Sequence, residues 1–227
     1  MTERVAVEQK VLSENDKLAA DIRRRLTSNK VLALNLVSSP GSGKTSLLEK
    51  TLGALNHELR LALVAGDVQT DNDARRLEKA GGKIVKPIVT GGTCHLDARM
   101  VTKAIEGFDL SDLDILFVEN VGNLVCPSSY DLGEEAKIVL LSVTEGEDKP
   151  LKYPSIFLRA ELLVLNKIDL LPYVPFDLAS SRENARHIHP EIEILEISCL
   201  TGQGLDPWRD WLERRRELVR APVASVG

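Results

Sequence analysis

The chain has 227 residues, of which 43% are hydrophobic and 28% charged, and its formal net charge is −5. That length suits one sizeable core, and the acidic balance does not favour nucleic acid as a partner. The Arg-Arg-Arg runs at 23–25 and 214–216 are interpreted as solvated helix faces. No stretch of about 18 apolar residues could span a bilayer, and residues 1–10 lack the apolar core of a secretory peptide. We therefore expect a cytoplasmic protein with no membrane partner.

Short apolar, β-branched segments alternate with segments of helical period from residue 31 onwards. This alternation predicts an α/β fold with a doubly wound, mostly parallel sheet and helices on both faces. Most of the strands are apolar throughout, as strands buried on both faces should be. The predicted strands are 31–37, 59–66, 83–89, 114–120, 137–143, 161–167 and 191–197. The predicted helices are 45–56, 71–80, 96–106, 155–159, 177–187 and 206–220.

Apolar residues at about helical spacing precede the first strand and predict an N-terminal amphipathic helix that packs on the main domain. They are Val7, Val11, Leu18, Ile22 and Leu26. We therefore expect a helical extension at 1–29, a main domain at 30–220 and a C-terminal tail at 221–227.

A glycine-rich turn follows the first strand. In SSPGSGKTSLL, residues 38–48, the Gly-x-Gly-Lys-Thr segment matches the second half of the P-loop signature, whereas Ser38 replaces its first glycine. A strand that leads through such a turn into a helix presents backbone N–H groups to phosphate oxygens. An ordinary glycine-rich turn would not require the Lys-Thr pair, so we predict that Lys44 binds the β and γ phosphates and Thr45 binds Mg²⁺. The predicted phosphate-binding residues are Gly41, Ser42, Gly43, Lys44, Thr45 and Ser46.

The sixth strand ends in LVLNKID, whose Asn166, Lys167 and Asp169 form the N-K-x-D pattern. A carboxylate there can accept from both the N1–H and the exocyclic amine of guanine, whereas adenine lacks this donor pair. The alternative is a strand-end turn capped by Asp169. The match falls at the carboxyl end of a late strand, where doubly wound sheets bind ligands, and this favours guanine recognition. The loop predicted to close over the base contributes Ser198, Cys199 and Leu200, of which Cys199 is interpreted mainly as a packing residue.

Two further strands end in acidic residues. Asp67 ends the second strand and Glu119 the fourth, and Gly122 follows three residues later. Carboxylates at neighbouring strand ends suit hydrated Mg²⁺ and the attacking water, while a glycine N–H suits the γ-phosphate. Asp71 and Asp73, at the start of a predicted helix, are interpreted as caps. The predicted magnesium ligands are Thr45, Asp67 and Glu119, and the predicted catalytic residues are Lys44, Asp67, Glu119 and Gly122.

Three candidate metal ligands follow the third and fourth strands. Cys94 and His95 come directly after a Gly-Gly-Thr segment, and Cys126 follows the switch glycine by four residues. Two thiolates and an imidazole suit Zn²⁺ or Ni²⁺ and leave a four-coordinate ion one ligand short. This set predicts a labile site that is completed by water or by a second subunit. The alternative is that each cysteine is a small buried residue. His187 and His189 do not share a helix face and are interpreted as solvent-exposed.

The combined motifs resemble the HypB family, whose members are GTPases that assist nickel insertion into [NiFe]-hydrogenase. The matching segments are SSPGSGKT, GDVQTDNDA, GGTCHLDA, ENVGNLVCPSSYDLGE, VTEGEDKPLKYP and NKIDLLP. The resemblance spans residues 31–218 and implies a P-loop GTPase of the branch that includes signal recognition and MinD-like proteins. It implies a nucleotide-dependent homodimer with Cys94, His95 and Cys126 as metal ligands at the interface.

The same resemblance implies GTP and Mg²⁺ as cofactors, Ni²⁺ or Zn²⁺ at the cysteine and histidine site, and two kinds of partner. These partners are other hydrogenase-maturation proteins and the hydrogenase large subunit. Lys149 and Lys152 are candidates for contacts to nucleotide or to the partner subunit. Residues 1–29 contain neither the cysteine cluster nor the histidine-rich tract of many family members, so a nickel storage role is not expected.

Only three residues separate Gly122 from Cys126, so a γ-phosphate contact at the glycine is predicted to displace a metal ligand. Metal affinity and nucleotide state should then be reciprocally coupled. Three alternatives are a urease-type nickel GTPase, a P-loop small-molecule kinase and a scaffold that binds nucleotide without turnover. The separate Cys-His and Cys-Pro pairs favour the hydrogenase type over the urease type, and the N-K-x-D pattern argues against a kinase.

Overall fold

A parallel sheet of seven strands forms the centre of the protein. The computed structural model describes residues 3–221, with side chains from Gln9 onwards. The strands are β1 (Leu32–Ser38), β2 (Leu61–Asp67), β3 (Ile84–Val89), β4 (Ile115–Glu119), β5 (Ala136–Ser142), β6 (Leu162–Asn166) and β7 (Glu193–Ile197). They pair in the order β3-β2-β4-β1-β5-β6-β7, and every pair is parallel. The predicted doubly wound α/β fold is therefore confirmed.

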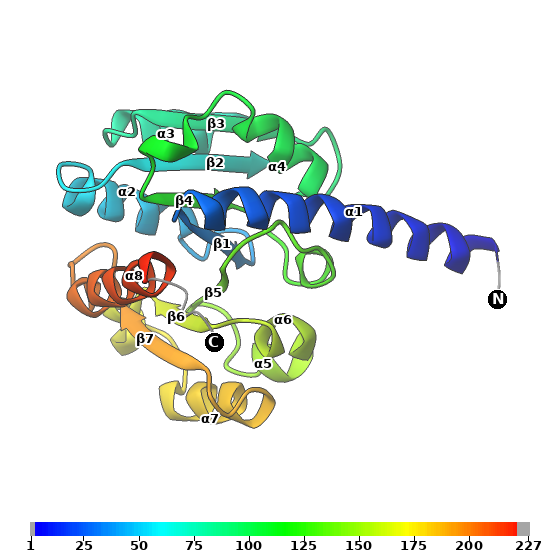
Figure 1. The fold of residues 1–227 in the computed structure, drawn as a ribbon. Coiled ribbons are helices and arrows are strands. Elements are labelled where there is room, and N and C mark those ends of the chain that lie inside the picture. The colour runs from blue at the N-terminus through cyan, green and yellow to red at the C-terminus, as the bar shows by residue number, and fades with distance from the viewer. Residues whose placement is uncertain (1–2, 222–227) are drawn as a thin grey trace, which may run out of the picture.

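Helices cover both faces of this sheet (Figure 1). They are α1 (Glu3–Ser28), α2 (Lys44–Leu55), α3 (Asn72–Lys79), α4 (Ala98–Ile105), α5 (Lys149–Lys152), α6 (Pro154–Leu158), α7 (Leu178–Ile188) and α8 (Leu205–Arg220). One face packs against α2, α3 and α8. The other face is divided, with α1 and α4 over β2, β4 and β1, and α6 and α7 over β5 and β6. The four-residue helix α5 was not predicted from the sequence, because it is too short to display a helical period.

The five inner strands are buried along nearly all of their length, whereas the edge strands β3 and β7 are partly exposed. Inner strands of a parallel sheet have helices on both faces, which explains their continuous apolar sequences. All seven carboxyl ends lie at the same edge of the sheet because all strands run in the same direction. The loops that contain the predicted functional residues therefore meet at that edge.

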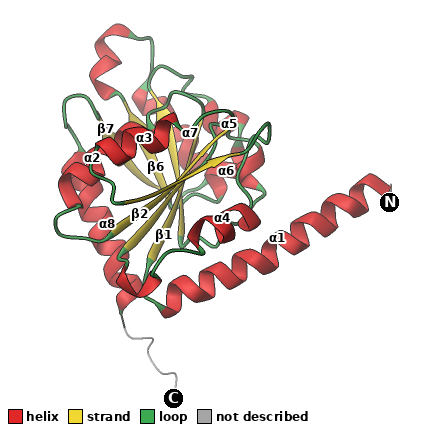
Figure 2. Cartoon of the chain, turned by 90° about the horizontal axis from the view of Figure 1, so that it is seen from above, coloured by secondary structure: helices red, strands yellow, loops and turns green. Residues whose placement is uncertain are grey.

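The N-terminal helix α1 packs on the domain over its second half only. Ala19, Ile22 and Leu26 are buried against α4 and the sheet. The N-terminal turns of α1 project beyond the sheet in both views (Figures 1 and 2). Val11 is 48% exposed, so the prediction that it packs on the domain is wrong. Val7 lies outside the residues whose side chains are described.

None of the helices within residues 3–221 has the length and apolarity needed to cross a membrane. The two arginine runs do not form a basic patch within this part of the chain. Arg23 pairs with Asp131, and Arg214 pairs with Glu193.

Candidate functional site

The loop between β1 and α2 brings the amino end of a helix to the carboxyl edge of the sheet. Gly41 and Gly43 adopt φ angles of 78° and 104°, which glycine tolerates far better than other residues. The first residues of α2 line a cleft, where their free N–H groups favour an anion. Lys44 is buried, and its Nζ donates to Ser38 Oγ at 2.9 Å. The serine that replaces the first P-loop glycine therefore holds the lysine predicted to bind phosphate.

The N-K-x-D segment packs directly on this loop, although the two are 124 residues apart in the sequence. Asn166 Nδ2 donates to Ser42 O at 2.8 Å, and Lys167 Nζ donates to Gly41 O at 2.7 Å. A Cβ atom at Gly43 would lie 2.3 Å from Asn166 Nδ2, so only glycine permits this approach. The structure thus brings together the two motifs that the sequence assigned to phosphate and to guanine.

Two adjoining clefts extend from these motifs. The first has a volume of about 430 Å³ and is lined by the P-loop together with Asp67, Glu119 and Gly122. The second has a volume of about 360 Å³ and is lined by Asp169, Cys199 and Leu200, among others. Gly43, Ser46 and Lys167 line both clefts. A ligand with a polyphosphate at one end and a base at the other fits this arrangement.

The second cleft is bordered by a hydrogen-bonded carboxylate. Ser198 is fully buried, and its Oγ donates to Asp169 Oδ1, which fixes the orientation of that carboxylate. Burial raises the pKa of Cys199 to about 11, so its thiol stays protonated at neutral pH. Cys199 also packs against the core, in agreement with its interpretation as a packing residue. Leu200 is 80% exposed at the rim.

Glu119 occupies the wall of the first cleft beside the P-loop. Its Oε1 accepts a hydrogen bond from Thr45 Oγ1 at 2.7 Å, while its Oε2 is buried without a partner among the described residues. Burial raises the pKa of Glu119 to about 7, although the positive charge of Lys44 opposes this shift. A buried carboxylate oxygen without a partner, next to a threonine hydroxyl, suits a hard divalent cation such as Mg²⁺.

Asp67 lies at the end of β2 and lines the same cleft. Burial opposes ionisation of Asp67, but hydrogen bonds from the backbone N–H groups of Gln69 and Thr70 outweigh it and lower its pKa. Asp67 is therefore an anion at neutral pH. Together with Thr45 and Glu119 it supplies a set of oxygen atoms that fits Mg²⁺.

The predicted switch glycine lies against the P-loop. A Cβ atom at Gly122 would lie 3.0 Å from Pro40 Cα, so a larger residue would push the two segments apart. Gly122 and Pro40 both line the first cleft. The backbone at Gly122 is thus close to the place predicted for the terminal phosphate.

The prediction that Asp71 and Asp73 cap a helix is wrong. Asp71 takes the N-cap position of α3, but its side chain pairs with Arg75 at 3.0 Å instead of accepting from the helix N–H groups. Asp73 lies inside the first turn of α3 and lines the first cleft near Arg76. Asp71 is thus placed to cap α3 but makes no capping hydrogen bond, and Asp73 is already the second residue of the helix.

The three candidate metal ligands form a cluster at the carboxyl edge of the sheet, where the loops after β3 and β4 meet. The ligand atoms of Cys94, His95 and Cys126 all lie within 4.8 Å of one another. The two sulfur atoms are 3.0 Å apart, and Cys94 Sγ lies 4.0 Å from His95 Nδ1. The His95 ring packs on Tyr130 with a centroid distance of 4.0 Å, which restricts its orientation. Asn123 Nδ2 donates to Cys94 O at 3.1 Å and so joins the two ligand loops.

In the metal-free cluster, the protonation state of His95 favours metal binding, whereas that of Cys94 does not. Burial lowers the pKa of His95, although Asp97 opposes the shift, so the imidazole is neutral and able to bind a metal. A hydrogen bond with Cys126 and burial raise the pKa of Cys94, so a bound metal would displace a proton. Two sulfurs and an imidazole fit Zn²⁺ or Ni²⁺.

The segment around α5 places Glu145, which sequence reasoning did not single out, beside the P-loop. Glu145 Oε1 lies 2.6 Å from Ser42 Oγ, and its Oε2 lies 3.3 Å from Lys149 Nζ. Lys149 Nζ also donates to Ser39 Oγ at 3.3 Å, which places it beside the P-loop as one of its two predicted roles requires. Lys152 instead pairs with Asp148 on the surface. The available signal was an acidic residue, Glu145, three residues after the end of the buried strand β5.

The two histidines near the end of α7, His187 and His189, differ in exposure. His187 is exposed, as predicted. The prediction for His189 is wrong, because it is half-buried and its Nδ1 is inaccessible. His189 is the C-cap of α7, where the chain turns towards β7.

Comparison with known proteins identifies the family. The model of the CobW/HypB/UreG nucleotide-binding domain matches residues 32–196. Hydrogenase maturation factor HypB of Escherichia coli K12 is 53% identical over 210 residues, which cover 92% of this chain and 72% of that protein. The chain belongs to the HypB hydrogenase maturation factors. Membership of the HypB proteins favours the hydrogenase type over the urease type.

Solved HypB structures share the fold. HypB from Helicobacter pylori in complex with nickel has a TM-score of 0.85 and 39% identity, over 93% of this chain and 99% of that chain. The signal recognition particle receptor FtsY from Elizabethkingia anophelis in complex with GDP has a TM-score of 0.52 and 13% identity, over 84% and 70% of the two chains. The resemblance of the HypB fold to the signal recognition branch is thus confirmed for the fold alone.

Proposed function

We propose that the protein is a GTPase that couples GTP binding and hydrolysis to nickel delivery during maturation of [NiFe]-hydrogenase. One observation carries this proposal. The segment 119–126 begins at Glu119 in the wall of the first cleft and ends at Cys126 in the metal-ligand cluster. A single short segment therefore contacts both the predicted nucleotide site and the predicted metal site.

Lys44 and the backbone N–H of Gly122 hold the γ-phosphate in this mechanism, and Asp169 selects guanine. A water oxygen attacks the γ-phosphorus while the bond to the β–γ bridging oxygen breaks, which yields GDP and phosphate. Asp67 and Glu119 orient that water, and together with Thr45 they would hold Mg²⁺. The ion, when bound, neutralises charge that develops on the phosphate oxygens.

Nickel is the cargo of the Cys94, His95 and Cys126 cluster in this account, and Zn²⁺ suits the same donor set. Cys94 is exposed and Val125, next to Cys126, is 59% exposed, so the cluster lies at an accessible and partly apolar surface. This supports a site completed by a second copy of the chain in the GTP state. Hydrolysis would release that interface and let the metal pass to other maturation proteins and to the hydrogenase large subunit.

Nucleotide turnover by the purified chain tests the proposal. GTP should be hydrolysed and ATP should not, and Lys44→Ala should reduce turnover by about two orders of magnitude, because it removes a charge from the γ-phosphate. Phosphate release in the presence of Mg²⁺ measures this. Equal rates for GTP and ATP would support the kinase-like alternative, and turnover unaffected by Lys44→Ala would exclude this site as its source.

A further inference from the structure

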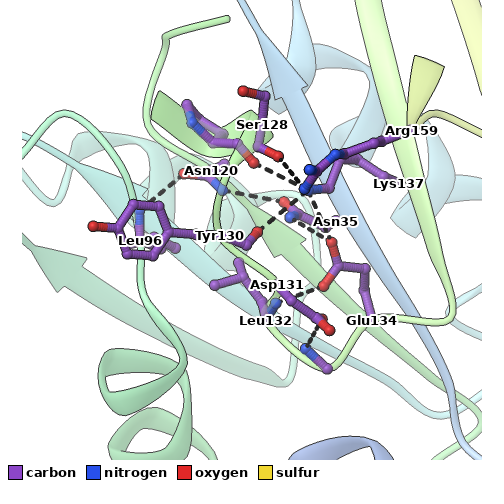
Figure 3. Close-up of polar contacts among 12 residues, drawn as sticks. Asn35, Leu96, Asn120, Ser128, Tyr130, Asp131, Leu132, Glu134, Lys137 and Arg159 are labelled. Carbon is purple, nitrogen blue, oxygen red and sulfur yellow. Dashed lines mark hydrogen bonds and ion pairs between the residues drawn. The ribbon is translucent and has the colours of Figure 1, made fainter. Parts of the chain in front are cut away.

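A chain of buried polar side chains runs from the end of β4 across β1 to β5 (Figure 3). It begins at Leu96, the residue after His95, and ends at Pro127, the residue after Cys126. The side chains between these points are those of Asn120, Asn35, Glu134 and Lys137, which are 1%, 0%, 8% and 7% exposed. We call them the buried relay.

The first half of the buried relay joins the switch segment to the first ligand loop. Asn120 Oδ1 accepts hydrogen bonds from Leu96 N at 3.0 Å and from Val121 N at 2.9 Å. Asn120 Nδ2 donates to Asn35 Oδ1 at 3.3 Å. Asn120 also lies between Glu119 and Gly122 in the sequence and belongs to the lining of the first cleft. One side chain thus contacts both the predicted nucleotide switch and the residue next to His95.

The second half joins β1 and β5 to the other ligand loop. Asn35 Nδ2 donates to Glu134 Oε1 at 3.1 Å, and Lys137 Nζ pairs with the same oxygen at 3.3 Å. Lys137 Nζ also donates to Pro127 O at 3.0 Å and to Tyr130 O at 3.3 Å. The loop that follows Cys126 is therefore fastened to an inner strand of the sheet.

The orientation of the relay is fixed by its chemistry. If the Asn35 amide were reversed, its oxygen would face the Glu134 carboxylate and its nitrogen would face the Asn120 nitrogen. Both contacts would be repulsive, so each amide has a single favourable orientation. Buried, paired networks of this kind keep their hydrogen bonds when a neighbouring segment shifts, because each lost partner leaves a desolvated polar group.

The relay lies at the seam between two apolar clusters. Asn35 shares a face of β1 with Ala33, which belongs to the cluster under α1 and α4, and with Val37, which belongs to the cluster under α6 and α7. On the neighbouring strands it is paired with Val118 and Lys137. Apolar side chains could fill this seam without any need for paired polar groups. The polar relay therefore suggests a role in addition to packing.

We propose that Asn120 is a positioning residue that transmits the nucleotide state to His95; this inference rests on the function proposed above. When the terminal phosphate displaces the switch segment, Asn120 moves with that segment. The hydrogen bond from Leu96 N to Asn120 Oδ1 then displaces the Leu96 backbone and, with it, the neighbouring His95. Lys137 holds the other ligand loop beyond Cys126, at Pro127 and Tyr130, so His95 and Cys126 are not displaced equally. The separation between His95 and Cys126 changes as a result, and with it the fit of the cluster to its metal.

Asn15 of α1 provides a matched control. It is 6% exposed, its Oδ1 accepts from Ala98 N at 2.8 Å, and its Nδ2 donates to Asp131 O at 2.8 Å. It therefore bridges the segments that follow the same two ligand loops through two buried hydrogen bonds. Those hydrogen bonds go to Ala98 and Asp131 and do not involve the switch segment 119–122.

The test is Ni²⁺ titration of the full chain with GDP and with a non-hydrolysable GTP analogue, by competition with a chromophoric chelator. In the wild type the two dissociation constants should differ by about fivefold or more. Asn15→Ala should keep this ratio, whereas Asn120→Ala should bring it to within about twofold of one. A wild-type ratio in Asn120→Ala, or an equal loss in Asn15→Ala, would overturn the role of Asn120. A ratio of one in the wild type would instead refute the coupling in the proposed function.

A second measurement requires no variant, in case Asn120→Ala does not fold. Amide hydrogen exchange in the metal-free wild type should change at Leu96 by about threefold or more when the GTP analogue replaces GDP, because its hydrogen bond to Asn120 is strained. The Ala98 amide, which is bonded to Asn15, is the internal control and should change less. Exchange at Leu96 that does not depend on the nucleotide would contradict the proposal.

Discussion

At the residue scale, Glu119 illustrates a conflict between stability and function. Its side chain is buried, and burial raises its pKa from 4.5 to about 7. The folded chain therefore retains a proton that the unfolded chain loses at about pH 4.5. Unfolding releases this proton between about pH 4.5 and 7, so Glu119 makes the metal-free protein less stable as pH rises through that range.

Glu119→Gln should relieve this cost. At pH 8 the variant without metal or nucleotide should gain up to about 3 kcal/mol in the free energy of unfolding, since each pH unit between two pKa values is worth about 1.4 kcal/mol. At pH 4.5 the gain should nearly vanish, and GTP hydrolysis should fall by about two orders of magnitude. Urea unfolding at both pH values and phosphate release measure these effects. A variant that is less stable than the wild type at pH 8 would contradict the account.

A second prediction at the residue scale concerns Asp169, which should determine the preference for guanine. Asp169→Asn replaces one acceptor by a donor, which mismatches the amine of guanine but matches the carbonyl of xanthine. GDP affinity should fall by about 10- to 100-fold and XDP affinity should rise. Titration with both nucleotides measures the change. A GDP preference that survives the substitution would assign guanine recognition to other residues.

At the scale of elements, Asp114 anchors the end of α8 to the strand β4. Burial opposes its ionisation, but hydrogen bonds from Arg60 and the charge of Arg220 outweigh burial and lower the pKa of Asp114. Arg60 N donates to Asp114 Oδ2 at 2.8 Å, and Arg220 pairs with Oδ1. A lowered pKa means stabilisation that is complete above the ordinary value of 3.8 and is lost as pH falls below it.

Asp114→Asn should therefore destabilise the protein in a pH-dependent manner. At pH 7 the free energy of unfolding should fall by about 2 kcal/mol, and the difference from the wild type should shrink at pH 3. Asp112→Asn is the control, because Asp112 also pairs with Arg60 but its side chain is 65% exposed, and its loss should stay below about 1 kcal/mol. Equal destabilisation by Asp114→Asn at both pH values would contradict the role of its charge.

The sequence predicts those elements whose pattern is local. The apolar strands, the turn into α2 and the polar residues at strand ends follow from short-range periodicity and motif spacing, and the cluster of Cys94, His95 and Cys126 follows from parallel strand direction. The buried relay depends on partners far apart in the chain, such as Asn35 and Glu134, 99 residues apart. Its signal was a polar residue inside an apolar strand, which must have a partner but does not reveal which one.

The dependence on distant parts of the chain and on exact helix boundaries also explains the wrong predictions for Val11 and Asp73. Val11 continues the apolar periodicity of α1, but periodicity cannot indicate where a helix passes the edge of the sheet. Asp73 is the second residue of α3, and a shift of one or two residues in a helix start turns a predicted cap into a cleft residue.

At the scale of the whole molecule, two predicted sites share one segment at the carboxyl edge of the sheet. The segment from Glu119 to Cys126 begins in the nucleotide cleft, passes the P-loop at Gly122 and ends at the metal-ligand cluster. Linkage requires that, if nucleotide state changes metal affinity, metal changes the preference for GTP over GDP by the same factor. The central claim is that this coupling exists and that it accompanies pairing of two chains.

Metal affinity and oligomer mass, measured together in both nucleotide states, test this claim most directly. Wild-type protein should bind Ni²⁺ with affinities that differ by about fivefold or more between GDP and a non-hydrolysable GTP analogue, and it should form dimers with the analogue. Cys126→Ala should lose the metal and the nucleotide dependence of its binding. Equal Ni²⁺ affinities in the two states, or metal binding and dimer formation that are unchanged in Cys126→Ala, would contradict the account.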